Sequence, residues 1–220
     1  AGTTLPTEIG EDGKTYYLIS SADDYVKFID LAQSGSYSKM NINAKLTADI
    51  DMDNVTDKTR TDFTIGRYDS NTTPTYLYPY TGTFDGNNKV IRNFKTKRNL
   101  NNNNQSAIGM FACTKGATIK NLGVEDAYIH NSYTSTVTKR NYYGGVIVGA
   151  DKGNTVIEGC YVKNSTIYKD QQMDGDQWNY AGFIPGSIAG TSVVNNSYST
   201  ANTYSFNDSV YKAGGNAVSG

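Results

Sequence analysis

Three aspartates at alternate positions are the densest group of side chains in this sequence that could do chemistry. Asp49, Asp51 and Asp53 follow a stretch in which apolar and polar residues alternate. In a β-strand this spacing places the three carboxylates on one face, with neighbours about 7 Å apart. Carboxylate oxygens are ligands that Ca²⁺ prefers, so these residues are candidate calcium ligands. The simpler interpretation, which we prefer, is a solvated strand face, and we predict no metal or other cofactor.

A second acidic group lies in the segment D-Q-Q-M-D-G-D-Q-W, residues 170–178. Its aspartates, Asp170, Asp174 and Asp176, could also bind Ca²⁺, with Gly175 allowing a tight bend. The ligand spacing of an EF-hand loop and its closing glutamate are both missing. We therefore interpret this segment as a loop rather than as a metal site.

Aromatic residues gather in two long polar segments. Tyr142 and Tyr143 belong to one of them, and Trp178 and Tyr180 belong to the next. Tyrosine and tryptophan rings stack on sugar rings, while a neighbouring polar group such as the Asp176 carboxylate can accept a hydrogen bond from a sugar hydroxyl. These residues predict a glycan-binding edge if the fold brings the two segments together. The alternative is that the rings only cover a hydrophobic edge of the fold.

The sequence is poor in the residues that carry most nucleophilic and zinc chemistry. It has a single histidine, His130, and two cysteines, Cys113 and Cys160. No spacing of Cys and His matches a zinc site, and one histidine argues against His-based catalysis. We predict that His130 is a surface turn residue. We also predict that both cysteines are buried free thiols, because they fall at different positions of an internal repeat.

Composition excludes several classes of protein and indicates a fold class. The 220 residues carry 20 basic and 21 acidic side chains, which is a formal net charge of −1. This balance argues against a nucleic-acid partner, and no run of about 18 apolar residues is present to span a membrane. The chain has 18 Tyr and 22 Gly and is rich in Thr and Asn. Such residues favour strands and turns over long helices, so we predict an all-β protein.

Local patterns predict one helix and one strand near the N-terminus. The sequence S-A-D-D at 21–24 is typical of a capping box, and apolar residues follow at helical spacing until Gly35. We predict an amphipathic helix over residues 22–34. Residues 41–50 alternate strictly and predict a half-buried strand. Its inward residues would be Ile42, Ala44, Leu46, Ala48 and Ile50.

An internal repeat organises the rest of the chain. Four segments align: K-V-I-R-N-F-K-T (89–96), A-T-I-K-N-L-G-V (117–124), T-V-I-E-G-C-Y-V (155–162) and S-V-V-N-N-S-Y-S (192–199). The first hydrophobic column of this alignment contains Ile91, Ile119, Ile157 and Val194. The second contains Phe94, Leu122, Cys160 and Ser197. Glycine-led segments start at Gly109, Gly145 and Gly182, and subtraction gives spacings of 36 and 37 residues.

A strand-rich repeat of this length predicts a β-solenoid, in which each repeat forms one coil and equivalent residues stack about 4.8 Å apart. Polar inserts at 98–106, 131–142 and 169–179 would leave the solenoid at one edge, which brings the aromatic segments together. We predict one domain over 1–220. Residues 1–66 would hold an N-terminal strand, the capping helix and the first coil, and residues 67–220 would hold the repeats.

Four motifs resemble GLUG-repeat proteins, which are bacterial surface proteins frequent in gut Bacteroidetes. They are A-K-L-T-A-D-I-D-M (44–52), Y-T-G-T-F-D-G-N-N-K-V-I-R-N-F (80–94), I-G-M-F-A-C-T-K-G-A-T-I-K-N-L-G-V (108–124) and Y-Y-G-G-V-I-V-G (142–149). The resemblance implies a right-handed parallel β-helix with an N-terminal capping helix, at an extracellular or outer cell-surface location. Cys113 and Pro185 depart from the glycine-led pattern, which argues against a symmetric, repeated ligand site.

Together these features predict a non-enzymatic adhesion or display module whose partner is a glycan or a host or bacterial surface protein. The alternative is a structural spacer or a self-assembling filament subunit. The last segment, G-G-N-A-V-S-G at 214–220, starts a further coil, so we expect end-to-end self-association or a longer parent protein. A β-helix polysaccharide lyase or hydrolase is the third possibility. The sequence lacks the stacked carboxylates beside a base that such an enzyme needs, and the motifs N-T-D and R-I-K are missing.

Overall fold

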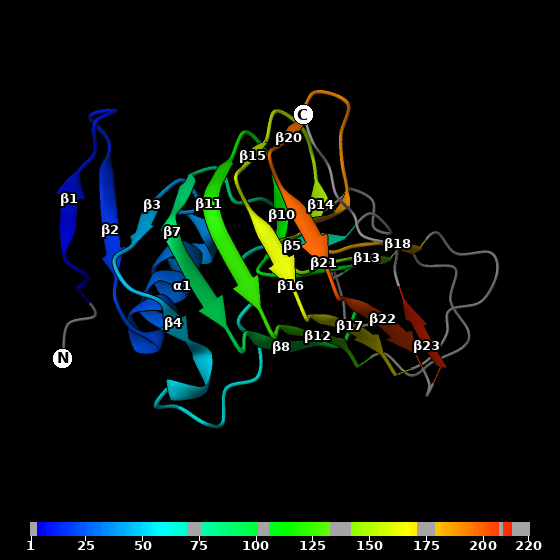
Figure 1. The fold of residues 1–220 in the computed structure, drawn as a ribbon. Helices are drawn as coiled ribbons and strands as arrows, with labels where there is room; N and C mark the ends of the chain where they lie inside the picture. The colour runs from blue at the N-terminus through cyan, green and yellow to red at the C-terminus, as the bar shows by residue number, and fades with distance from the viewer. Residues whose placement is uncertain are drawn as a thin grey trace.

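The protein is a β-solenoid of about four turns (Figure 1). The computed structural model describes residues 4–69, 76–100, 106–132, 142–170, 179–206 and 209–212. Strands make up 51% of it, and these residues contain one α-helix, which is not long and apolar enough to cross a membrane. The predicted all-β solenoid with an N-terminal helix is therefore confirmed. The right-handed sense and the domain bounds stay predictions.

The largest face of the solenoid is a ten-stranded sheet, here called the first sheet, in which β11 is central. Neighbouring strands of this sheet pair in parallel, except that β1 pairs antiparallel to β2 at the N-terminal end. The strands are β1 (Thr7–Ile9), β2 (Thr15–Ile19), β3 (Asn43–Leu46), β4 (Ile50–Asp51), β7 (Thr83–Arg92), β11 (Thr118–Glu125), β15 (Val156–Glu158), β16 (Tyr161–Lys163), β20 (Val193–Asn195) and β21 (Tyr198–Thr200).

The second sheet has five strands and joins the first at a sharp turn in each coil. Its strands are β8 (Lys95–Arg98), β12 (Tyr128–Asn131), β17 (Thr166–Lys169), β22 (Thr203–Phe206) and β23 (Ser209–Lys212). Residues Asn93, Asp126 and Asn164 occupy the turn in successive coils with positive φ. Asparagine and aspartate tolerate this left-handed conformation, which explains their recurrence at the turn.

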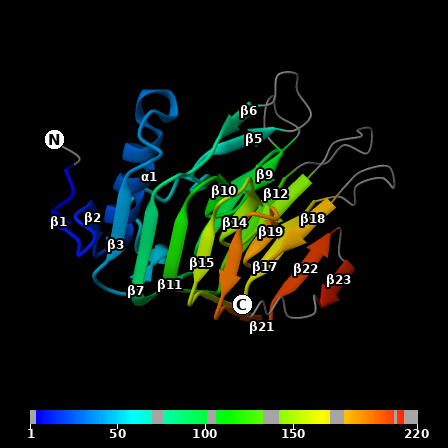
Figure 2. The same cartoon turned by 90° about the horizontal axis from the view of Figure 1, so that it is seen from above.

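Two three-stranded sheets complete each coil, as the view from above shows (Figure 2). One contains β9 (Ala107–Ile108), β13 (Tyr142–Gly145) and β18 (Asn179–Gly182). The other contains β10 (Phe111–Thr114), β14 (Val148–Asp151) and β19 (Pro185–Ser187). A separate antiparallel pair is formed by β5 (Arg67–Asp69) and β6 (Tyr76–Tyr78). The polar inserts connect the second sheet to β9, β13 and β18, so their described ends share one edge.

The helix α1 (Ala22–Tyr37) lies beside β2 and β3 at the N-terminal end of the solenoid (Figure 2). Ser21 caps it by accepting a hydrogen bond from the backbone N–H of Asp24, as predicted. Its regular part ends at residue 33, because Ser34, Gly35 and Ser36 have non-helical dihedral angles. The rings of Tyr25 and Phe84 meet edge to face with centroids 6.1 Å apart. The helix thus closes the hydrophobic interior at this end.

The predicted strand over 41–50 is interrupted. Residues 47–49 separate β3 from β4. Ala44, Leu46 and Ile50 are buried as the alternation predicted. The predicted inward direction of these three side chains is therefore correct, but the single predicted strand is divided by residues 47–49.

The repeat alignment is right for the later copies and wrong for the first. Ile119 pairs with Ile157, which pairs with Val194, as predicted. Ile91, however, pairs with Val124, and Phe84 takes the predicted place of Ile91 beside Ile119. The cause is the length of β7, because its first residues, 83–85, pair with residues 118–120, and Ile91 lies in its later part.

Charged side chains alternate in sign along two outward columns of the first sheet. The register places Lys45 beside Asp85, then Lys120, then Glu158. A second column runs through Asp51, Arg92, Glu125 and Lys163. The columns end at the uncharged Asn195 and Thr200. Opposite charges at register positions favour this pairing over a slipped one.

Candidate functional site

A groove of about 290 Å³ lies where the segment 52–63 meets the first strands of the second sheet. Small-ligand sites begin at about this volume. The groove is lined by Met52, Asp53, Val55, Asp57, Lys58, Arg60, Thr61, Phe63, Asn93, Lys95, Thr96, Lys97, Tyr128 and His130. The segment 52–63 begins with the short 3₁₀ helix η1 (Met52–Asn54). It is tied to β8 because Thr96 Oγ1 accepts a hydrogen bond from the backbone N–H of Phe63.

Tyr128 and His130 line one side of the groove. With Tyr168, which packs against both, they form an aromatic cluster. Strand alternation turns all three rings outward from β12 and β17, where His130 and Tyr168 are register partners. The centroids of Tyr128 and Tyr168 are 6.0 Å apart with the rings nearly parallel. The imidazole meets them edge to face at 5.7 Å and 5.2 Å. Tyr128 is 36% exposed, so the cluster is open to a ligand.

The cluster is held in place by a polar contact to the next coil. His130 Nε2 lies 2.6 Å from Oδ1 of Asp170. Partial burial, with Tyr168 and Asp170 close by, raises the pKa of the Tyr128 hydroxyl. This hydroxyl therefore stays protonated at neutral pH and can donate a hydrogen bond.

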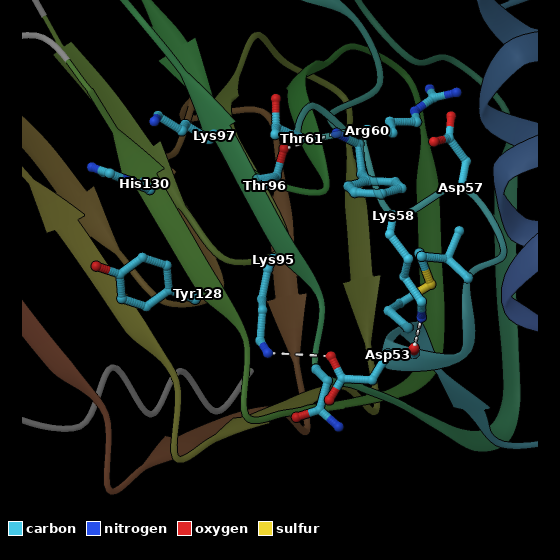
Figure 3. Close-up of a pocket in the computed structure, with 14 residues that line it drawn as sticks. Asp53, Asp57, Lys58, Arg60, Thr61, Lys95, Thr96, Lys97, Tyr128 and His130 are labelled. Atoms are coloured by element: carbon cyan, nitrogen blue, oxygen red, sulfur yellow. Dashed lines mark hydrogen bonds and ion pairs between the residues drawn. The ribbon is translucent and has the colours of Figure 1, made fainter.

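Basic side chains line both sides of the groove. Figure 3 shows Tyr128, His130 and Lys97 on one side, opposite Asp57, Lys58 and Arg60. Lys95 Nζ reaches Asp53 Oδ1 at 3.2 Å, and the Lys58 amine donates to the backbone carbonyl of Asp53. Arg60 pairs with Asp30 at 2.8 Å. The arrangement supplies aromatic rings and several hydrogen-bond donors around one small volume.

Asp49, Asp51 and Asp53 do not converge as calcium ligands would. Asp49 Oδ1 accepts a hydrogen bond from the backbone N–H of Val90. Asp51 accepts one from the Asn93 side chain, which lowers the pKa of the Asp51 carboxyl. With Asp53 bound to Lys95, each aspartate holds a different point of the next coil. Among the described residues, no three His, Cys, Asp or Glu side chains gather as a metal site.

Of the four aromatic residues of the predicted edge, the structure describes the side chains of Tyr142 and Tyr143. Tyr142 is 1% exposed and points into the solenoid, so it cannot stack on a sugar; that prediction is wrong. Tyr143, the next residue, alternates to the other side and is half-buried against Tyr68, at 5.2 Å. The backbone of Tyr180 pairs with Tyr143. The Tyr180 side chain and all of Trp178, Asp174 and Asp176 lie outside the described residues.

Both cysteines are buried free thiols, as predicted. Burial raises the pKa of each thiol to about 12. Cys113 pairs in register with Ala150 rather than with a glycine. The cysteines therefore act as small core residues and do not take part in the groove.

The aromatic cluster is not among the predicted sites, and the prediction of His130 at a surface turn is wrong, because His130 lies in β12. The available signal was the alternation of A-Y-I-H-N at 127–131 and T-I-Y-K at 166–169. In each segment an isoleucine faces inward, so the flanking Tyr128, His130 and Tyr168 must face outward.

Comparison with known proteins assigns no family. No family model and no curated protein matches this sequence. Among solved structures, a "putative immunoglobulin A1 protease" from Bacteroides ovatus is similar, with 14% sequence identity and a TM-score of 0.32. The match covers 93% of this chain and 80% of that chain. At such values the likeness does not bear on function, and the resemblance to GLUG-repeat proteins stays a prediction.

Proposed function

We propose that this protein is an extracellular or cell-surface module that binds glycans in the groove beside β8 and β12. The observation that carries the proposal is the aromatic cluster, whose Tyr128 and His130 rings line a small groove. Aromatic rings pack against the apolar faces of sugars, and the surrounding lysines and the Tyr128 hydroxyl can bond to sugar oxygens. The cluster takes the place of the edge aromatics that the sequence predicted.

The test is a glycan-array screen of the folded protein beside two variants. Tyr128→Ala removes a ring of the groove. Tyr76→Ala is a matched control, because Tyr76 is 37% exposed and meets Tyr78 edge to face at 5.7 Å, away from the groove. We expect binding that Tyr128→Ala abolishes and Tyr76→Ala retains. Equal binding by both variants would place the site elsewhere, and no binding by the wild type would refute the function.

A self-associating spacer is the second candidate function. Three of the exposed large hydrophobic side chains belong to the last described coil: Ile188, Val193 and Tyr198, at 51%, 44% and 49% exposure. Strands β20 and β21 are also the edge of the first sheet. Exposed edge strands favour pairing with another chain. Sedimentation velocity across a range of concentrations tests this candidate, and Val193→Lys should abolish any association at this edge.

We further propose that the protein is not an enzyme. The three carboxylates of the predicted calcium group are engaged with the next coil, and the described cysteines are buried. Incubation with acidic and neutral polysaccharides should release neither new reducing ends nor unsaturated products. Release that depends on the concentration of folded protein would overturn this part of the proposal.

A further inference from the structure

The groove is locally basic in a protein whose net charge is −1. Its lining holds four basic side chains, Lys58, Arg60, Lys95 and Lys97, against two carboxylates, Asp53 and Asp57. A local excess of one sign in a concave site attracts ligands of the other sign. The charge of the lining therefore bears on which glycans the groove would accept.

The two carboxylates are already engaged. Asp53 binds Lys95, and Asp57 accepts hydrogen bonds from the backbone N–H and the hydroxyl of Thr59, at 3.0 Å and 2.6 Å. Arg60 is held by Asp30. Among the described residues, the amines of Lys58 and Lys97 have no carboxylate within ion-pair distance. Because the Lys58 amine also donates to the backbone carbonyl of Asp53, Lys97 is the cation of the lining that remains for a ligand.

The lysines of the second sheet have different register neighbours from the lysines of the first sheet. In the first sheet, Lys45 and Lys120 both have Asp85 as a register neighbour. In the second sheet, Lys95 lies beside Tyr128, and Lys97 lies beside His130. The second sheet thus places aromatic residues beside its lysines, where the first sheet places the carboxylate of Asp85.

We infer that the ligand is an acidic saccharide, bound with a sugar ring against Tyr128 and its carboxylate or sulfate group at Lys97. This inference rests on the proposed function and adds the chemical class of the glycan. Lys97 and His130 are adjacent on the outer face of the sheet, so an acidic group at Lys97 lies beside a ring packed on the aromatic cluster (Figure 3). A neutral sugar would use the rings and leave the amine unpaired.

The test uses paired oligosaccharides, each in an acidic form (uronate, sialylated or sulfated) and in the neutral form that differs only by that group. Wild-type protein is titrated with each pair. Lys97→Gln removes the charge in the groove. Lys163→Gln is the control, because Lys163 is an exposed lysine at an outward position of β16 in the first sheet. Thermal unfolding checks that both variants are folded.

We expect the wild type to bind acidic members at least about tenfold more tightly than their neutral partners. Lys97→Gln should weaken the acidic members by about fivefold and leave the neutral ones unchanged, as loss of an exposed ion pair predicts. Lys163→Gln should change neither. Equal affinity for both forms, with Tyr128→Ala still abolishing binding, would overturn the acidic specificity and retain the glycan function. Absence of binding to every member would overturn both.

Discussion

His130 in one coil and Asp170 in the next are joined by a contact of 2.6 Å between Nε2 and Oδ1. The contact fixes the imidazole between the rings of Tyr128 and Tyr168. It therefore couples two coils at the place where the candidate site opens. A solenoid builds such a site from neighbouring coils, and no single repeat contains it.

The first prediction concerns this contact. In Asp170→Ala the imidazole loses its partner, so we expect the ring signals of His130 to move and its contacts to Tyr128 and Tyr168 to weaken in NMR spectra. The assignment is unambiguous because the chain has one histidine. The melting temperature should change little, since a partly exposed pair contributes about 0–1 kcal/mol. Unchanged imidazole signals would show that the contact does not orient the ring.

The second prediction concerns a lysine inside the solenoid. Lys169 is 1% exposed, its Nζ lies 4.7 Å from the centre of the Tyr142 ring, and burial lowers its pKa from 10.5 to about 7. Between these values the unfolded chain binds more protons than the folded protein, so the lysine makes stability rise with pH in this window. Below pH 7 the lysine is charged in both states, and the full penalty for burying it is present.

Lys169→Met should therefore stabilise the protein by at least about 2 kcal/mol at pH 6, since one pKa unit corresponds to about 1.4 kcal/mol. The gain should shrink towards pH 10. Denaturant unfolding at the two pH values measures both free energies. A gain of the same size at both would contradict the assignment of the shift to burial.

The third prediction concerns close backbone packing at Gly145. A Cβ added there would overlap the carbonyl oxygen of Val148 and lie 3.0 Å from the backbone nitrogen of Gly186. We expect Gly145→Ala to lower the free energy of unfolding by about 2 kcal/mol or more, because the backbone cannot move aside. Gly190→Ala is the control, since an added Cβ there meets nothing within 4 Å. Equal effects of the two substitutions would rule out this packing.

The fourth prediction concerns the two thiols. Burial raises the pKa of Cys113 and Cys160 to about 12, so neither forms a thiolate at neutral pH. A disulfide reagent such as 5,5′-dithiobis(2-nitrobenzoate) should label neither cysteine in the native protein and both after unfolding. The labelling rate should follow the unfolding rate. Rapid native labelling of one thiol, identified with Cys113→Ala and Cys160→Ala, would show that it is accessible.

The sequence predicted those features that depend on local pattern. The helix with its Ser21 cap and the stacking of Gly145 on Gly182 follow from residue types at fixed spacing. The alignment of the first repeat was wrong because it matched I-R-N-F at 91–94 to the similar I-K-N-L at 119–122. The hydrogen-bond register depends instead on the whole length of β7. A similar run of residue types does not determine which residues pair across strands.

The candidate site was harder to predict for a related reason. Whether a ring faces the core or solvent depends on strand parity, and a shift of one residue exchanges the two, as Tyr142 and Tyr143 show. The aromatic cluster also needs two coils in register, and the polar inserts between them vary in length. Only the paired strands β12 and β17 establish that His130 and Tyr168 meet.

The alternating charges of the first sheet restrict how such a protein can change its length in evolution. Loss of the coil that carries Lys120 and Glu125 would set Asp85 against Glu158 and Arg92 against Lys163. Each like-charged pair would be destabilising by up to about 1 kcal/mol. Duplication of one coil has the same result at its new junction. Coils can therefore be gained or lost in twos without repulsion, so the sheet favours even steps in the number of its repeats.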